Sequence, residues 1–323
     1  MNDRAPFRLD ATLASVLEEG GLDWFVDRAG NFGVALPGAS IRFHRVDLDA
    51  VPTLQARCSW GRRANLDHLE KLHAVLATLN FERPFPKAYA RVLDDGSVAV
   101  VWESLLAGMP APRAEIAAFV HAFVSRTVSQ LRKLDALLPD PLGGVGAAGT
   151  ALLADPAADA SAQPLTAAPL AASLVDDVAA PTASPSPAAL TAPASALDLG
   201  ALASQLRAQQ ITVREHTGAI EVETQGLAVR VEAYPEVVRV CTALDASDWL
   251  EVAPAVINDW NQHMLAPAAG MDALGGGSEV SVELVFDSVA GLSEDCSRLA
   301  WAVHAVARGA LALAAYGRES ALS

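Results

Sequence analysis

The 323-residue sequence is poor in positive charge and in aromatic side chains. Lysine and arginine number 23 against 38 aspartates and glutamates, a formal charge of −15 that repels nucleic-acid phosphates and anionic membrane surfaces. We therefore expect neither nucleic-acid binding nor membrane insertion. Aromatic residues make up 6% of the chain against 52% for all hydrophobic types, because much of the apolar content is alanine. Three lysines against twenty arginines are a usage typical of a high-GC bacterium.

Long hydrophobic runs are also missing. The first ten residues mix charges and contain no apolar stretch of the ~7 to 15 residues that a signal peptide needs, which favours a cytoplasmic location. The most apolar segment, residues 299–316, contains His304 and Arg308 and is rich in alanine. It therefore predicts a buried helix and not a membrane span.

The sequence has few residues arranged for chemistry. Its three cysteines, Cys58, Cys241 and Cys296, lie far apart without a CxxC pair, which supports neither a zinc site nor a disulfide framework. A GxGxxG match at residues 144–149 follows Pro-Asp-Pro and not a strand, so it does not predict a dinucleotide site. No P-loop, HExxH or GxSxG motif occurs. We expect no catalytic residue, cofactor or metal, and hence not an enzyme.

Residues 140–196 divide the chain. They hold 20 alanines and 8 prolines but no aromatic residue, lysine or arginine. Such a segment cannot bury enough apolar surface to offset its ordering entropy, so it predicts a disordered linker. The predicted domains are therefore residues 7–139 and 197–320.

The two flanks resemble each other. An offset of 183 residues pairs Pro52 with Pro235, Cys58 with Cys241 and His121 with His304. This register predicts that the first two cysteines lie on equivalent inner strands and resist alkylation. The paired histidines are either pH-sensitive groups at a domain interface or helix-flank residues with local hydrogen bonds.

The apolar periodicities predict the same order of elements in both flanks. In the first they predict helices at 10–19, 65–79 and after Pro112, with strands at 32–36, 41–46, 54–60, 87–93 and 98–102. In the second they predict helices at 201–208, 248–258 (with a kink at Pro254) and 293–316, an extended entry at 211–213, and strands at 219–223, 227–233, 237–242 and 279–286. The predicted fold class is α+β, with two copies of an α-β-β-β-α-β-β-α unit whose antiparallel sheet carries helices.

Short stretches after the second helix of each flank carry a family resemblance. The second flank has Trp260-Asn261, and the first has Leu79-Asn80 followed by residues 85–89 (Phe-Pro-Lys-Ala-Tyr) and the turn at 94–98. This order resembles the YbjN family, bacterial proteins with the fold of type III secretion chaperones that are named for a proposed role in sensory transduction regulation. The second flank departs from the pattern, with Ala-Pro-Ala-Ala-Gly at 266–270.

The resemblance implies a partner-binding module and not an enzyme. Chaperones of this fold dimerise and hold extended segments of client proteins. Two tandem copies therefore imply an intramolecular pseudo-dimer or a homodimer. We expect a protein client or regulatory partner, and the alternative is a self-associating structural or regulatory protein.

Five residues are candidates for partner binding. Trp60, Arg62 and Arg63 stand at a predicted strand end, where a guanidinium fork beside an aromatic ring could grip a client carboxylate. The alternative is that the two arginines only keep a loop soluble. Lys87 and Tyr89, in the basic-aromatic stretch that resembles the family, complete the set.

Overall fold

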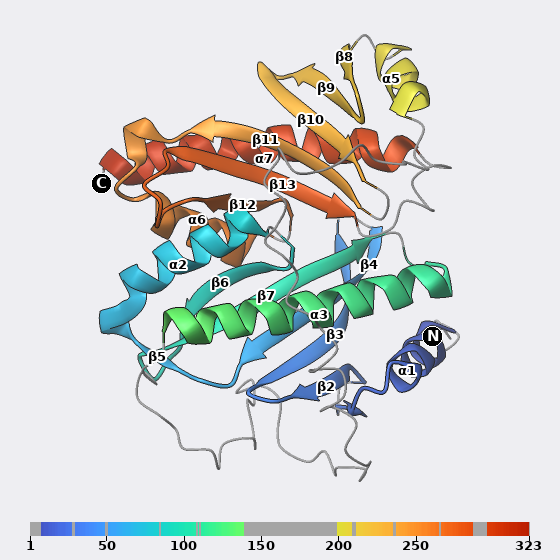
Figure 1. The fold of residues 1–323 in the computed structure, drawn as a ribbon, viewed down its shortest axis with the longest axis vertical. Coiled ribbons are helices and arrows are strands. Elements are labelled where there is room, and N and C mark those ends of the chain that lie inside the picture. The colour runs from blue at the N-terminus through green and yellow to red at the C-terminus, as the bar shows by residue number, and fades with distance from the viewer. Residues whose placement is uncertain are drawn as a thin grey trace, which may run out of the picture. The chain divides into compact units, whose positions relative to one another are not determined.

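The computed structural model describes two compact units (Figure 1). Within the described residues, unit 1 contains residues 8–66 and 91–138, and unit 2 contains residues 67–90 and 199–322. The predicted linker and both predicted domain limits beside it lie outside the described residues. Those residues are 8–27, 30–48, 51–83, 85–107, 109, 111–138, 199–208, 211–234, 237–264, 266–286 and 296–322.

Unit 1 is built on an antiparallel sheet. A tight turn with Gly38 at φ +74° joins its second and third strands, and residues 94–96 form the predicted hairpin turn. Because side chains alternate along a strand, Leu54, Ala56 and Cys58 all face the core. The strand order is β1 (Trp24–Val26), β2 (Phe32–Leu36), β3 (Ala39–Leu48), β4 (Val51–Trp60), β7 (Ser97–Ala107) and β5 (Ala64–Asn65), with β6 (Lys87–Val92) also pairing with β7.

Two helices cover the core face of this sheet. α3 (Arg113–Leu137) begins directly after Pro112 and runs along β4 and β7, and α1 (Arg8–Glu19) packs against α3 (Figure 1). Aromatic side chains fill the space beneath α3, where the Phe119 and Phe123 rings lie 6.4 Å apart and Phe43 stands 6.5 Å from Phe123. These large rings determine how far α3 stands from the strands.

Unit 2 contains a second antiparallel sheet, whose long helix packs more closely. α7 (Cys296–Leu322) lies across the strands, and α5 (Leu199–Ala208) packs against α7 and β8. Leu299–Leu322 is apolar and long enough to cross a bilayer by composition alone, but more than half of that window is buried within the fold. The strand order is β12 (Ala268–Met271), β13 (Glu279–Phe286), β11 (Val238–Asp245), β10 (Leu227–Ala233), β9 (Ala219–Thr224) and β8 (Thr212–His216).

Unit 2 also contains a helix from the first half of the sequence. α2 (Leu69–Glu82) follows a short 3₁₀ turn, η1 (Leu66–His68), and packs against β12 and α6 (Ala253–His263). Ala77 of α2 belongs to the buried core of this unit. Because the chain enters unit 2 at residue 67 and leaves it after residue 90, the units do not follow the two flanks predicted from the sequence.

An asparagine joins each of these helices to the strand that follows. The side-chain amide of Asn80 donates to the carbonyl of Ala88 (2.8 Å) and its oxygen accepts from the Ala88 amide (2.6 Å). Asn261 makes the same pair of bonds with Ala269, at 2.8 and 2.9 Å. A cis peptide bond precedes each strand, at Phe85-Pro86 and Ala266-Pro267.

The structure corrects several expected boundaries. The first residues of the predicted helix at 65–79 instead form β5 and η1, because residues 64 and 65 pair with β7. Pro254 causes no kink, since it lies in the first turn of α6, where no backbone N–H is needed. Three short strands, β1, β5 and β12, were not predicted.

The predicted equivalence of Cys58 and Cys241 was wrong, because the two side chains lie on opposite faces of their sheets. Cys58 is fully buried opposite Trp102, on the core face of its sheet. Cys241 lies opposite Glu283, on the face that also carries Arg239, and is only partly buried. A one-residue slip moves a side chain to the other face of a sheet, so the alignment at an offset of 183 paired residues of opposite orientation.

Candidate functional site

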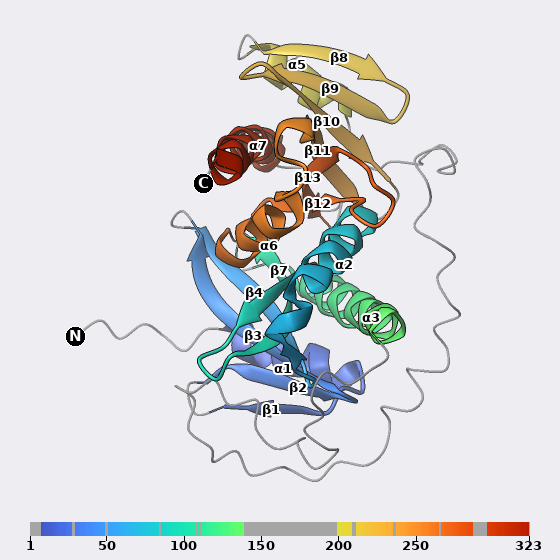
Figure 2. The same cartoon turned by 90° about the vertical axis from the view of Figure 1, so that its left-hand side faces the viewer.

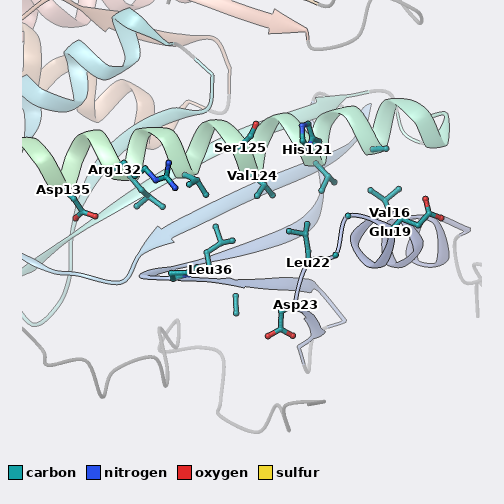
Figure 3. Close-up of a pocket in the computed structure, with 18 residues that line it drawn as sticks. Val16, Glu19, Leu22, Asp23, Leu36, His121, Val124, Ser125, Arg132 and Asp135 are labelled. Atoms are coloured by element: carbon teal, nitrogen blue, oxygen red, sulfur yellow. The ribbon is translucent and has the colours of Figure 1, made fainter. Parts of the chain in front are cut away.

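A groove of about 430 Å³ opens in unit 1 between α1, α3 and the start of the β2–β3 hairpin (Figure 3). Its walls are mostly aliphatic and its rim is charged. A concave, mainly apolar space with a few polar groups at its edge is the usual form of a binding site. The lining residues are Val16, Glu19, Gly20, Gly21, Leu22, Asp23, Ala35, Leu36, Pro37, Ala117, Val120, His121, Val124, Ser125, Val128, Leu131, Arg132 and Asp135.

One wall of the groove is a second apolar stripe of α3. Ala117, Val124 and Val128 recur at helical spacing beside the face that packs on the sheet, and they remain half-buried. From Ala117 to Asp135 this wall of α3 extends over 18 residue-to-residue steps, about 27 Å at 1.5 Å per step. This wall is therefore long enough to lie beside several turns of another helix.

The opposite wall depends on the way α1 ends. Gly20 and Leu22 donate their amides to the carbonyls of Val16 (3.0 Å) and Leu17 (3.1 Å), while Gly21 adopts a φ of +63°. A left-handed residue after the last turn lets the chain reverse direction there. Leu22 and Asp23, which follow this turn, line the groove (Figure 3).

The rim carries three carboxylates and one arginine, together with His121. Glu19 forms an ion pair with Arg113, whose hydrogen bond lowers the pKa of that carboxyl, and it also accepts a bond from Ser15. Asp23 and Arg132 are exposed at the edge. Because Glu19 pairs with Arg113 and Asp135 pairs with Arg62, the charges around the rim nearly balance.

Two of the predicted binding residues lie at one end of this groove. Arg62 donates to Asp135 (2.7 Å) and to the carbonyl of Leu138 (3.5 Å), and its guanidinium lies 5.0 Å from the centre of the Trp60 ring. Trp60 itself is 2% exposed. The sequence predicted that Arg62 grips a client carboxylate, and in the structure its carboxylate belongs to α3.

The other three predicted residues lie elsewhere. Burial lowers the pKa of Arg63. The negative charge of Asp95, which lies in the turn between β6 and β7, opposes this shift. Lys87 and Tyr89 belong to unit 2, are each 3% exposed, and lie with the ammonium 5.8 Å from the ring centre. The Lys87 ammonium donates to the carbonyl of Met264, directly after α6. The structure thus divides the five residues between its two units.

A polar cluster on the sheet of unit 2 is the other concentration of charge. Arg239 binds both oxygens of Glu283, through Nε (2.6 Å) and Nη2 (2.5 Å), and reaches Glu232 at 3.4 Å. Tyr234 donates to Glu232 at 2.8 Å. Desolvation, assisted by the Glu232 carboxylate, raises the Tyr234 pKa. Because Arg239 neutralises the buried Glu283 carboxylate, the members of this ion-pair network satisfy one another.

Metal-binding geometry is not found in the part of the chain that the structure describes. No three histidine, cysteine, aspartate or glutamate side chains there come together as ligands for an ion.

The groove itself was missed by sequence reasoning. The apolar periodicity of α3 predicts a buried face formed by Ile116, Phe119, Phe123 and Leu134, and these residues are buried. The second stripe was available as a signal, since Ala117, Val124 and Val128 follow the same spacing. Its partner, the turn after α1, could not be placed beside it without tertiary structure.

No family model matches the chain. No curated protein matches it at a significant level either. Among solved structures, it is similar to a crystal structure of YbjN from E. coli, described as a proposed transcription regulator, with 18% identity over 39% of this chain and 90% of YbjN. The TM-score of 0.34 is too low for the fold or function of YbjN to be transferred.

Proposed function

We propose that this protein is a non-catalytic binding module, chaperone-like or regulatory, whose unit 1 groove holds an amphipathic helical segment of a partner protein. The groove is the observation that supports this function. Its long wall repeats small and branched aliphatic residues at the spacing that a docked helix uses for its own anchors. The partner would present apolar residues at i, i+3 or i+4, and i+7.

Charge gives the partner a sign. The rim charges nearly balance, but the whole chain carries a formal charge of −15. A partner helix with lysine or arginine beside its apolar stripe would be attracted, and one flanked by glutamate would be repelled. The Arg62 bond to Asp135 then has a positioning role, because it holds the last turns of α3 at one end of the groove.

We also infer that the two flanks are copies of one YbjN-like unit. The paired asparagine bonds to Ala88 and Ala269 support this, since each asparagine precedes its bonded alanine by eight residues. Two buried carboxylates also support it. Glu103 on β7 binds Arg57, and Glu283 on β13 binds Arg239.

Peptide binding tests the proposed function. The probe is a fluorescent 18-residue peptide with leucine at i, i+3, i+4 and i+7 and lysine or alanine elsewhere, compared with a peptide carrying glutamate for lysine. We expect saturable binding of the lysine peptide by anisotropy, and binding of the glutamate peptide weaker by about tenfold or more, equal to ~1.4 kcal/mol.

Matched variants make the test specific to the groove. Val124→Asp places a charge on the groove wall, whereas Ala118→Asp adds the same charge to an exposed position of α3 outside the lining. Long-range attraction of a cationic peptide rises equally in both. A loss of binding of about tenfold in Val124→Asp alone supports the groove. The proposal would be contradicted by equal binding of the peptide to the two variants or by no binding to the wild type. It would also be contradicted if light scattering showed a dimer that Val124→Asp dissociates, since a second copy would then occupy the groove.

A further inference from the structure

The surface that α6 and β12 present in unit 2 is filled by segment 67–90 of the same chain (Figure 2). We propose that this surface is a dedicated docking site for that segment, built so that the first half of the chain pairs with the second half and not with a copy of itself. This inference is independent of the groove. It rests on three contacts, each made by a residue whose counterpart in the other half lacks the necessary chemistry.

The first contact is a close approach of two backbones. A Cβ added to Gly270 in β12 would lie 2.3 Å from the Phe81 amide nitrogen and 2.5 Å from the carbonyl carbon of Asn80, both in α2. Neither atom can move as a flexible side chain would. Counting nine residues from the bonded asparagines, Asn80 and Asn261, the counterpart of Gly270 is Tyr89. A second copy of the first half would therefore place a tyrosine where the approach of α2 requires glycine.

The second contact is an asparagine that binds both backbone groups of one residue. Asn258 of α6 accepts from the Ala90 amide (2.6 Å) and donates to the Ala90 carbonyl (3.0 Å). Asn258 is buried, and a primary amide supplies one acceptor and one donor as a neighbouring strand would. Its counterpart, three residues before the bonded asparagine of the first half, is Ala77. Alanine offers neither group.

The third contact is a cation at a helix end. The buried Lys87 ammonium donates to the carbonyl of Met264, at the C-terminus of α6, where the helix dipole favours positive charge. Seven residues after Asn261 the counterpart is Ala268. Two second halves could not make this bond.

These asymmetries make the pairing directional. Two first halves would lack the glycine and the asparagine of the α6–β12 surface, and two second halves would lack the lysine of the segment. Specificity of this kind arises when the wrong pairing leaves groups unpaired or clashing. A bond from the Leu274 amide to the Thr78 hydroxyl (3.2 Å) adds a further contact between α2 and the second half.

Cutting the full-length chain between its halves tests the proposal. A protease site inserted between residues 165 and 166, within the predicted linker, allows cleavage after purification. The tether holds the halves at roughly millimolar effective concentration, so cleavage exposes the affinity of the surface itself. We expect the fragments to co-elute at the mass of the intact chain, 33.6 kDa, and to separate on dilution with a measurable Kd.

Substitutions at the three contacts identify the surface. We expect Gly270→Ala and Asn258→Ala each to raise the Kd of the cleaved halves at least about tenfold. Gly277→Ala is the matched control, because its added Cβ would meet Asp272 at an ordinary 3.5 Å. Circular dichroism of the uncut variants distinguishes weaker pairing from misfolding, since the tether maintains pairing in the uncut chain. Lys87→Met supplies a further variant that adds no side-chain bulk to the surface.

Three outcomes would overturn the proposal. The fragments could separate at 100 µM, they could elute as homodimers of either half, or Gly270→Ala, Asn258→Ala and Lys87→Met could all leave the Kd of the cleaved halves unchanged.

Discussion

The two units differ in how closely their long helices approach the residues around them. In unit 1, α3 stands on phenylalanine rings and leaves a second apolar stripe open as the wall of a groove. In unit 2, glycines bring α7 against bulky neighbours: a Cβ at Gly309 would lie 2.7 Å from Pro267, and one at Gly317 would lie 2.4 Å from the Trp249 ring. Large residues under a helix leave space beside it, whereas small residues let its neighbours fill that space.

Under the proposed function, this difference in packing separates two tasks. Unit 1 keeps an apolar surface accessible, which is what binding a partner requires. Unit 2 closes its surfaces, both under α7 and in the Arg239 network on the other side of its sheet. We therefore expect unit 2 to be sensitive to small substitutions and the groove of unit 1 to be tolerant of them.

The largest effect is expected at the buried ion pair of unit 2. Arg239→Ala leaves the Glu283 carboxylate, whose side chain is 1% exposed, without its bidentate partner. Breaking a buried pair from one side costs about 3 to 5 kcal/mol of unfolding free energy, to be measured by urea denaturation. The control is Arg214→Ala, whose ion pairs with Glu221 and Glu223 are exposed and which should cost less than about 1 kcal/mol. Equal losses of unfolding free energy in Arg239→Ala and Arg214→Ala would show that the buried ion pair does not stabilise unit 2.

A smaller loss is expected where α7 approaches Trp249. Gly317→Val forces the added side chain into the indole ring, and overpacking of this kind costs about 1 to 3 kcal/mol. Ala312→Val, at an exposed position of the same helix, should cost only about 0.5 kcal/mol through helix propensity. Thermal unfolding of the two variants compares them directly. If both shift the midpoint equally, α7 is not closely packed at Gly317.

The corresponding enlargement in unit 1 should be nearly neutral. Val124→Phe directs a larger side chain into the groove, so we expect the unfolding free energy to change by less than about 1 kcal/mol. The same variant should abolish binding of the leucine–lysine peptide, because it fills the space the peptide needs. A loss of stability as large as that of Gly317→Val would remove the contrast between the two helices.

The smallest effect concerns the rates of thiol modification. Burial raises the pKa of the Cys58 thiol, and it raises that of Cys241 to about 12. Alkylation requires the thiolate, so both thiols should react slowly at pH 8, and Cys241, which is partly buried, should react before Cys58. The Cys241 rate should continue to rise from pH 10 to 11, where the rate of a free thiol has nearly levelled off because its pKa is ~8.5. Peptide mass spectrometry of iodoacetamide-treated protein follows each residue, and faster modification of Cys58 would reverse the assignment of faces.

The sequence predicted most long elements because their periodicity is local. The alternation of residues 279–286 and the stripe from Leu69 to Leu79 need no tertiary information to be recognised. β12 was missed because its alanines and glycine have little strand propensity, and pairing with β13 and the amide of Asn261 hold it extended. The sequence also could not predict that α2 joins unit 2. The stripe of Leu72 and Leu76 indicates that the helix is buried, but not which surface buries it.

The candidate site was predicted only at its edge. Trp60 and Arg62 stood out because an aromatic ring beside a cation is a recognisable local pattern, and both lie at the end of α3 near the groove. Lys87 looked like a binding residue for the same local reason, yet its partner is Met264, 177 residues further along the chain. Side chains that bind another part of their own chain resemble partner-binding residues until the fold shows where that part lies.

The interleaving of the two units also orders events during synthesis. Segment 67–90 is made early, but α6, which it packs against, begins only at Ala253, 163 residues after Ala90. A ribosome adding ~5 to 20 residues per second takes roughly 8 to 30 s to cover that distance. During this interval the second half does not yet exist. The Ala77 side chain and the Ala90 backbone, which the finished protein buries against that half, therefore have no partner in the nascent chain.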